Sequence, residues 1–279
     1  MKTWLITGCS SGIGKGIAKA VLESGDQAVV TARKPETVKE FVEQYPETAI
    51  AVALDVCDQS SIDTAVKAAY EKFGTIDVLV NNAGYGYRGA VEEGEDAEVR
   101  RMYETNLFGP IALIKAVLPK MREQKSGYIL NVTSIAAARS AIGSAYYASS
   151  KAALELLTNG LMQEVAPLGI KAMVVQPGAF NTRFSDQQSL QGTSNIIHDY
   201  ESAVGNRRPG NFVNHHDQAG DPEKAGKVIV EVVNGDDLPQ ILTLGEAAVT
   251  AVKKALETKM SELDKWADVS ASCDYNKGD

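Results

Sequence analysis

Tyr147 and Lys151 are two residues whose types and spacing could move a proton, and they follow an Ala/Ser-rich stretch that begins at Ser134. If this stretch is helical, positions four residues apart share one face, so the phenol and the ammonium project into the same place. A free tyrosine titrates near pH ~10 and is a poor base at neutral pH. A neighbouring cation favours the phenolate, and lowering the phenol pKa by about three units needs roughly 4 kcal/mol. The pair therefore predicts an acid/base group for proton transfer to or from an alcohol.

Tyr-x-x-x-Lys alone is a weak signal, because a surface helix can carry an ordinary tyrosine and a solvated lysine at this spacing. Tyr146 is not four residues before Lys151, so we expect it to pack elsewhere on the helix. The interpretation of Tyr147 depends on elements that would bring a cofactor and a substrate to it.

The composition of the 279-residue chain is that of a globular protein, with 44% hydrophobic residues and a net charge of −8. Its acidic balance argues against binding nucleic acid or anionic membranes, whose phosphates attract clustered Lys and Arg. Cys9, Cys57 and Cys273 show neither disulfide nor metal spacing. There is no N-terminal signal pattern, and no apolar run reaches the roughly 18–20 residues that span a bilayer. We therefore expect a soluble cytoplasmic protein.

A glycine-rich turn lies between a predicted strand at residues 3–7 and a predicted helix that ends near Gly25. It contains Gly8, Gly12 and Gly14, in the pattern Gly-x-x-x-Gly-x-Gly. Glycines let the backbone turn tightly and let a pyrophosphate approach, and the following helix N-terminus offers free N–H groups. This context favours a dinucleotide site over a turn without a ligand.

The charge after the second predicted strand, residues 27–32, bears on which dinucleotide binds. A site that prefers NAD usually has Asp or Glu there, whose carboxylate accepts hydrogen bonds from the ribose hydroxyls. This chain has Arg33 and Lys34 instead. Because a guanidinium can form paired hydrogen bonds with a 2′-phosphate, the sequence favours NADP over NAD. The alternative is that both are solvated loop charges.

Polar or small residues also follow two later strands, at 49–54 and 78–80. These are Asp55 and Val56 after the first strand, and Asn82, Ala83 and Gly84 after the second. Strand ends of an open parallel sheet face its ligand crevice, which suits a cofactor edge. The alternatives are a helix cap at the aspartate and a plain turn at Asn-Asn-Ala-Gly.

A long helix is predicted over residues 96–123, and Asn106 falls in its middle, three residues before Gly109-Pro110. A proline there disturbs the hydrogen-bond ladder, and an asparagine near such a bend can hold a water with a freed carbonyl. It could equally be only a poor helix former. The stretch before this helix, residues 85–95, is predicted to be an exposed loop.

Strands alternate with helices six times, and further strands are expected at 128–132, 171–175 and 239–245. The predicted fold class is α/β, with a doubly wound parallel sheet of about seven strands and helices on both faces. We expect one domain over residues 1–279. Residues 180–220 are polar and too long for one regular element, which suits a mobile substrate lid.

His198, His215 and His216 lie in that polar stretch. Adjacent histidines do not share a helix face, and no carboxylate pattern accompanies them. No metal site is predicted.

Taken together, these motifs resemble those of the short-chain dehydrogenase/reductase family. The resemblance covers about residues 3–245, in the family's order and spacing, and it points to the branch with Thr-Gly-x-x-x-Gly-x-Gly and Tyr-x-x-x-Lys motifs. The glycine loop from Thr7 to Gly14, Asn82-Ala83-Gly84, Ser134, Tyr147 with Lys151, and Pro177-Gly178 carry it. It implies a single-domain Rossmann fold and a catalytic rather than structural Tyr147.

The resemblance implies a role for each matching position. Tyr147 would be the catalytic acid/base, Lys151 would lower its pKa and bind the nicotinamide ribose, and Ser134 would hydrogen-bond the substrate oxygen. Asn106 would support a water that links Lys151 to solvent, and Arg33 resembles the basic position of NADP-preferring members. The other cofactor contacts would be Gly8, Ser10, Ser11, Gly12, Ile13 and Gly14 at the pyrophosphate, Asp55, Val56, Asn82, Ala83 and Gly84 at adenine and ribose, and Pro177, Gly178 and Thr182 at the nicotinamide.

The C-terminal residues 246–279 are predicted to add a helical extension. Its apolar residues recur near helical spacing: Val249, Val252, Leu256, Met260, Leu263 and Trp266. This resembles the tail of family members that act on hydrophobic alcohols and ketones. The family resemblance implies a homodimer or homotetramer, and this helix could alter its subunit contacts. The alternative is that the helix packs on its own domain.

The predicted function is hydride transfer between NADP(H) and a carbonyl or secondary alcohol, with a hydrophobic or steroid-like compound as one option for the substrate. The alternative is a catalytically silent NADP-binding sensor or scaffold, against which the complete Ser134, Tyr147 and Lys151 set argues. Epimerase-like relatives use a Gly-x-x-Gly-x-x-Gly loop that this chain lacks, and enoyl reductases use a wider Tyr-to-Lys gap.

Overall fold

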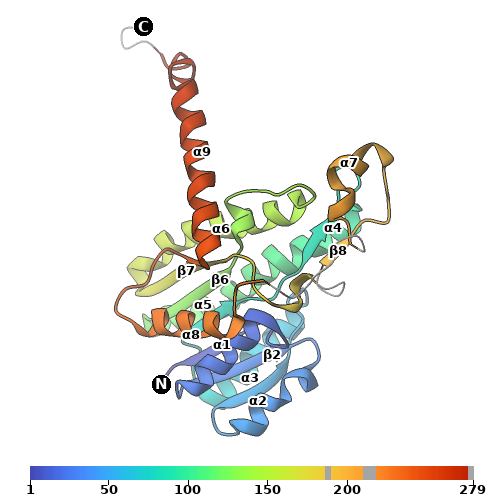
Figure 1. Ribbon diagram of the computed structural model, residues 1–279. Coiled ribbons are helices and arrows are strands. Elements are labelled where there is room, and N and C mark those ends of the chain that lie inside the picture. The colour runs from blue at the N-terminus through green and yellow to red at the C-terminus, as the bar shows by residue number, and fades with distance from the viewer. Residues whose placement is uncertain (186–189, 210–217, 276–279) are drawn as a thin grey trace.

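The protein is built on one seven-stranded sheet in which every neighbouring pair of strands is parallel (Figure 1). The computed structural model describes residues 1–185, 190–209 and 218–275. In sheet order the strands are β3 (Ala49–Ala53), β2 (Gln27–Ala32), β1 (Thr3–Ile6), β4 (Val78–Asn81), β6 (Gly127–Val132), β7 (Ile170–Pro177) and β9 (Ile241–Leu244). The predicted α/β fold is confirmed. None of the described helices is long and apolar enough to cross a membrane.

Helices cover both faces of this sheet, and each face has its own hydrophobic core. One face packs against α1 (Gly12–Glu23), α2 (Lys39–Gln44) and α8 (Pro222–Asn234). The other packs against α3 (Gln59–Phe73), α5 (Gly109–Gln124) and α6 (Ala145–Val165). Two more helices, α4 (Asp96–Tyr103) and α7 (Glu201–Val204), lie outside these cores.

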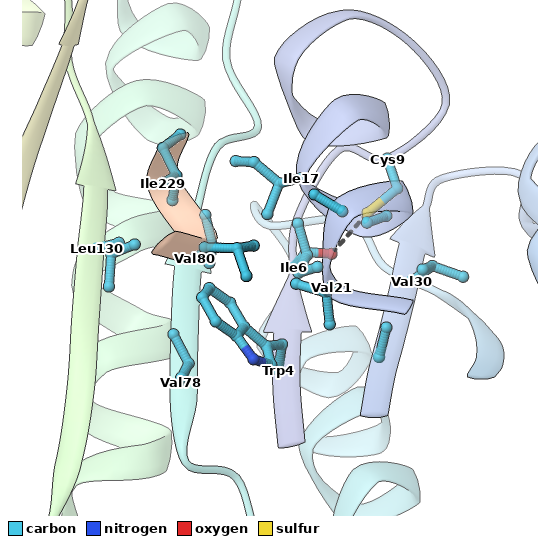
Figure 2. Close-up of a cluster of buried hydrophobic side chains, with 14 of the residues drawn as sticks. Trp4, Ile6, Cys9, Ile17, Val21, Val30, Val78, Val80, Leu130 and Ile229 are labelled. Atoms are coloured by element: carbon cyan, nitrogen blue, oxygen red, sulfur yellow. Dashed lines mark hydrogen bonds between the residues drawn. The ribbon is translucent and has the colours of Figure 1, made fainter. Parts of the chain in front are cut away.

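The first core has Trp4 at its centre (Figure 2). This fully buried indole packs among Val78, Val80 and Leu130 of neighbouring strands and residues of α1 and α8. Its ring N–H donates to Asp26 Oδ2 at 3.1 Å, so the one polar atom of the side chain is satisfied. The buried thiol of Cys9 lies in the same core, where burial raises its pKa to about 12. Cys9 is therefore a packing residue rather than a nucleophile.

Helices α1 and α8 cross at two glycines. A Cβ added to Gly226 would lie 2.1 Å from the carbonyl oxygen of Gly16, and one added to Gly16 would lie 2.0 Å from that of Pro222. Only glycine allows this approach. The crossing fixes α1, whose N-terminus follows the glycine-rich turn.

The stretch predicted as an exposed loop, residues 85–95, contains a strand and several buried residues, so that prediction was wrong. Gly86–Arg88 forms β5, which pairs in parallel with β8 (Leu190–Gly192) as a separate two-stranded sheet. The Tyr87 side chain is 1% exposed and that of Glu93 is 0% exposed. The polar composition of the stretch did not reveal that another polar segment covers it.

The long helix expected over 96–123 is continuous but contains a π-helical turn at Glu104–Phe108. Gly109 donates its N–H to the carbonyl of Glu104, five residues earlier. The distortion predicted near Pro110 is therefore present, and it places Asn106 at the widened turn.

The last helix, α9 (Glu246–Ala271), projects away from the rest of the protein (Figure 1). Within the described chain only Ala248 of this helix is buried, whereas Leu256, Leu263 and Trp266 are 52%, 68% and 51% exposed. The alternative that this helix packs on its own domain is therefore wrong.

Candidate active site

The glycine-rich turn after β1 and the segment after β4 are joined at the carboxyl edge of the sheet. The side chain of Asn82 donates to the carbonyl oxygens of Thr7 and Gly8 at 2.8 and 3.2 Å. The hydroxyl of Thr7 in turn accepts the backbone N–H groups of Asn82 and Ala83, both at 2.9 Å. Asn82 therefore fixes the shape of the turn, and its amide is already engaged by backbone groups.

The turn is packed so closely that only glycine fits at two of its positions. A Cβ on Gly14 would lie 2.3 Å from Asn82 Nδ2 and 2.4 Å from the Gly8 carbonyl oxygen. Gly12 has a φ of +60°, and a Cβ there would lie 3.2 Å from Thr182 Cγ2. Thr182 therefore lies beside the turn itself, while Gly178 is held by its N–H bond to the Leu244 carbonyl at 3.1 Å.

The N-terminus of α1 is available to an anion. Its N-cap, Ser11, is extended and forms no side-chain cap, and the first turn contains no acidic residue. The first backbone N–H groups of a helix have no partner within the helix and attract negative charge. This arrangement fits a pyrophosphate, with Ser10 exposed and Ile13 partly buried beside it.

The residues expected at the adenine end lie after β2 and β3. Arg33 is exposed, and among the described residues no carboxylate forms an ion pair with it. Asp55 is exposed and accepts the N–H of Cys57 at 3.0 Å, while the cap of α3 is Asp58. Val56 is buried against Gly109.

Ser134 and Tyr147 meet beyond the end of β6. Burial raises the pKa of the Tyr147 phenol to about 12, although a hydrogen bond with Ser134 and the charge of Arg88 both act to lower it. The sequence predicted that Lys151 lowers this pKa, whereas burial dominates and raises it. The Tyr147 ring packs against Phe184, with ring centroids 5.5 Å apart.

Lys151 is a buried cation on the same helix. Its Nζ donates to the Val132 carbonyl at 2.9 Å, and burial lowers its pKa to about 8. A Cβ on Gly84 would lie 3.2 Å from this Nζ and 3.0 Å from Asn106 Oδ1. Gly84 therefore lies directly against the ammonium, where a side chain would crowd Lys151 and Asn106.

Asn106 lies beside Lys151 and holds the backbone after Gly84. Its Oδ1 accepts the N–H of Tyr85 at 3.1 Å, and its Nδ2 donates to the carbonyl of the same residue at 2.9 Å. Nδ2 also donates to the Ser150 hydroxyl at 3.2 Å. Asn106 is therefore more than a poor helix former, because it joins the π-helical turn to α6 and to the cofactor edge.

Two sets of residues near this site were missed from the sequence. Asn81 donates to Asn131, which donates to Thr158 of α6, each at 2.8 Å, and all three side chains are buried. This chain of hydrogen bonds orients α6 on the sheet. Arg88 is the second, because the sequence indicates residues 85–88 as a wall of the substrate pocket but not the effect of Arg88 on Tyr147. Tyr146 packs as expected, edge-on against Tyr87.

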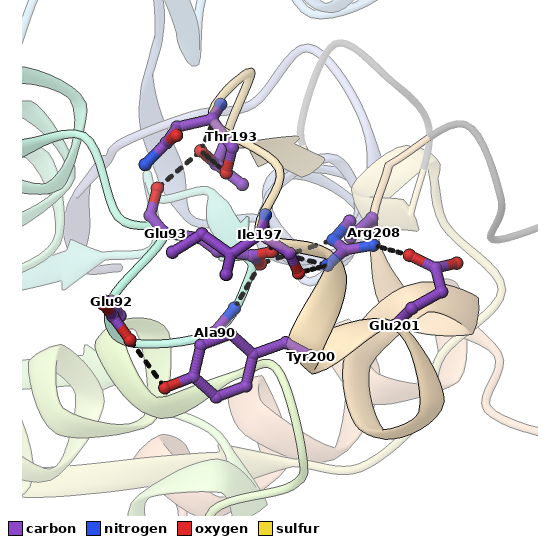
Figure 3. A network of polar contacts seen from close by, with 9 residues as sticks. Ala90, Glu92, Glu93, Thr193, Ile197, Tyr200, Glu201 and Arg208 are labelled. Atoms are coloured by element: carbon purple, nitrogen blue, oxygen red, sulfur yellow. Dashed lines mark hydrogen bonds and ion pairs between the residues drawn. The ribbon is translucent and has the colours of Figure 1, made fainter.

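The polar segment expected to be a lid is held at both its base and its middle. At the base, Phe180 pairs with Gly220 in an isolated parallel β-bridge. In the middle, the buried carboxylate of Glu93 accepts bonds from the Arg208 guanidinium and from the Ile197 N–H, the latter at 3.0 Å (Figure 3). Arg208 also pairs with Glu201. We call Glu93, Arg208 and Ile197 the clasp.

Among the described residues, no group of three or more His, Cys, Asp or Glu side chains could hold a metal ion. His198 lies in a short helical turn and is part of no such group. His215 and His216 lie outside the described residues.

Comparison with known proteins relates this chain to enzymes of one family. A family model described as short chain dehydrogenase matches residues 2–192. The chain is 37% identical to Oxidoreductase BOA17 of Botryotinia fuckeliana over 270 residues, 96% of this chain and 98% of that protein. It is 40% identical to a short-chain dehydrogenase from Streptomyces avermitilis, with a TM-score of 0.90 over 98% of both chains.

Two further solved structures contain dinucleotides. One is an alcohol dehydrogenase from Thermococcus sibiricus complexed with 5-hydroxy-NADP, at 26% identity and a TM-score of 0.72 over 88% of this chain and 96% of that one. The other is a 3-ketoacyl-(acyl-carrier-protein) reductase from Brucella melitensis complexed with NADH, at 26% identity and a TM-score of 0.73 over 87% and 96%. Structures similar to this chain thus bind either cofactor.

Proposed function

This chain belongs to the short-chain dehydrogenase/reductase family of oxidoreductases, and we propose that it reduces a ketone or aldehyde with NADPH, or oxidises the corresponding alcohol with NADP⁺. The observation that carries the proposal is the grouping of Ser134, Tyr147 and Lys151 at the sheet edge where the glycine turn fits a pyrophosphate. Two similar structures, an alcohol dehydrogenase and a 3-ketoacyl-(acyl-carrier-protein) reductase, agree with this chemistry.

The protein groups would handle the proton and the orientation of the reactants. The cofactor supplies or accepts the hydride. Because the pKa of Tyr147 is about 12, its phenol is protonated at neutral pH and can donate that proton to a carbonyl oxygen. The Ser134 hydroxyl, which acts on Tyr147, would turn its single O–H to donate to the same carbonyl oxygen.

Lys151 and Asn106 would support the cofactor and the proton supply. Lys151 has two N–H groups besides the one bonded to Val132, and these would bind the ribose hydroxyls. With a pKa of about 8, Lys151 can exchange a proton near neutral pH. Both groups of the Asn106 amide bond the backbone of Tyr85, so a water relay would use the second acceptor position of its oxygen.

We propose NADP rather than NAD because Arg33 lies exposed after β2, at the position where a carboxylate would otherwise repel the 2′-phosphate. The test is to measure dissociation constants for NADPH and NADH by fluorescence, and turnover over a panel of ketones and aldehydes. NADPH should bind at least about tenfold more tightly, and Arg33→Ala should remove that preference. A preference for NADH in the wild-type protein would contradict the role of Arg33.

Homodimer or homotetramer formation and a cytoplasmic location stay predictions. Light scattering coupled to gel filtration tests the first, and fractionation of cells that express the protein tests the second.

A further inference from the structure

Arg88 is an arginine beside the catalytic centre that no part of the proposed mechanism uses. It lies on β5, and its guanidinium donates to the hydroxyl of Ser144, the residue before α6. Tyr147 lies in the first turn of the same helix. The charge of Arg88 acts to lower the pKa of the Tyr147 phenol. Arg88 is therefore part of the wall beside the reacting group.

Arg207 reaches the same place from the polar segment. A Cβ on Gly143 would lie 3.2 Å from the Cβ of Arg207, so this arginine packs on the residue before Ser144. The charge of Arg207 acts on Arg88. Gly143 is also bonded to the β5 side of the site, because its carbonyl accepts the N–H of Gly89 at 3.1 Å. Two separate segments thus bring one cation each to the start of α6.

Nothing in the described residues neutralises this pair. The ion pairs within residues 1–185, 190–209 and 218–275 include none to Arg88 or Arg207. Arg88 is partly buried, and burial together with Arg207 lowers its pKa. By contrast, Arg208, the neighbour of Arg207, is paired with two carboxylates. A partly buried guanidinium without a counter-ion is unfavourable unless a ligand supplies one.

The start of α6 adds to the positive character of this place. The helix has 21 residues, its N-cap Ser144 makes no side-chain cap, and no acidic residue lies in its first turn. The uncapped N–H groups and the helix dipole favour an anion here. The protein as a whole has a net charge of −8, so a cationic surface at this one place is not a consequence of its composition.

We propose that Arg88 and Arg207 form an anion-recognition subsite, so that the carbonyl substrate of this enzyme carries a carboxylate or phosphate group close to its reacting carbon. The reduction of such a substrate rests on the proposed function, whereas the binding of the anion at these two arginines does not. Arg88 can form paired hydrogen bonds with either group, and Arg207 adds a second charge from the polar segment. The substrate class is then an oxo acid or a phosphorylated ketone rather than a neutral hydrophobic ketone.

The kinetic test compares acids with matched neutral compounds. The carboxylate arm uses 2-, 3- and 4-oxopentanoate against their methyl esters, and the phosphate arm uses hydroxyacetone phosphate against hydroxyacetone. In the wild-type protein at least one acid should exceed its neutral partner in kcat/KM by about tenfold or more. Arg88→Gln should remove most of that ratio and Arg88→Lys should retain part of it. Arg122→Gln, which removes an exposed arginine at the end of α5, is the matched control and should leave the ratio unchanged.

A binding measurement separates the subsite from the reaction. Calorimetry with 2-hydroxypentanoate, 2-hydroxypentanamide and inorganic phosphate needs no turnover. Tighter binding of an anion than of the amide, lost in Arg88→Gln but not in Arg122→Gln, would support the subsite even if no carbonyl were reduced. Equal binding of acid and amide, equal kcat/KM for acids and neutral partners, or an equal effect of the two substitutions would each overturn it.

Discussion

The crossing of α1 and α8 should tolerate no side chain at Gly226. A Cβ there would lie 2.1 Å from the Gly16 carbonyl oxygen, whereas ordinary contacts begin at 3.4 Å, so the helices must separate by about 3.4 − 2.1 = 1.3 Å. The obstructing atom belongs to the backbone and cannot rotate away. Overpacking of this kind costs about 1–3 kcal/mol, and we expect the upper end. Since alanine recovers about 1 kcal/mol of helix propensity, Gly226→Ala should lower the free energy of unfolding by about 2 kcal/mol.

Gly160 provides the matched control, because it lies within α6 and a Cβ there would meet nothing within 4 Å. Gly160→Ala should raise the free energy of unfolding by up to about 1 kcal/mol. Urea denaturation at one protein concentration compares the free energies of unfolding of the two variants. The difference reports stability only if the m-values are unchanged. Because α1 follows the glycine turn, Gly226→Ala should also weaken NADPH binding. If Gly226→Ala were as stable as Gly160→Ala, the tight crossing would be refuted.

Substitutions at Arg208 and at Asn82, with Glu201→Gln as a control, test the supports of the site. Arg208→Met leaves the Glu93 carboxylate buried without its charge partner, so the free energy that holds the clasp closed should fall by about 3–5 kcal/mol. Hydrogen exchange at the Ile197 amide, which donates to Glu93, measures this loss. Glu201→Gln, which removes the exposed partner of Arg208, should cost less than about 1 kcal/mol. Burial alone would raise the pKa of Glu93, but its hydrogen bonds lower it from 4.5 to about 2, so the contribution of the clasp should be complete above about pH 4.5 and disappear towards pH 2. Asn82→Ala should cost about 1–3 kcal/mol in thermal unfolding, since two carbonyls of the glycine turn lose their donor; an unchanged melting temperature would argue against this role.

The sheet could be predicted because each strand is a short apolar run that ends in glycine or a polar residue. β2 begins and ends where expected, and the other strands differ by a few residues at their ends. The failures come from contacts between segments far apart in the chain. Tyr87 and Glu93 are buried only because residues from about 190 to 208 cover them, and no local pattern records that partner.

The same distinction holds within the site. The spacing of Tyr147 and Lys151 on one helix is a local property, and the structure places them in consecutive turns of α6. The pKa of Tyr147 is not local. It depends on burial, on Ser134 from the segment after β6 and on Arg88 from β5, so spacing alone gave a lowered pKa where the structure gives about 12. Arg88 and Arg207 are 119 residues apart, and only the fold brings them to one place.

The most direct test of the central claim is the rate of NADPH oxidation by Tyr147→Phe, measured with a carbonyl compound that the wild-type protein reduces. Phenylalanine keeps the ring that packs on Phe184 and removes only the hydroxyl that would donate the proton. NADPH binding should stay close to that of the wild type, and turnover should fall by about 10²–10⁴-fold. Turnover close to that of the wild-type protein would contradict the assignment of Tyr147 as the proton donor.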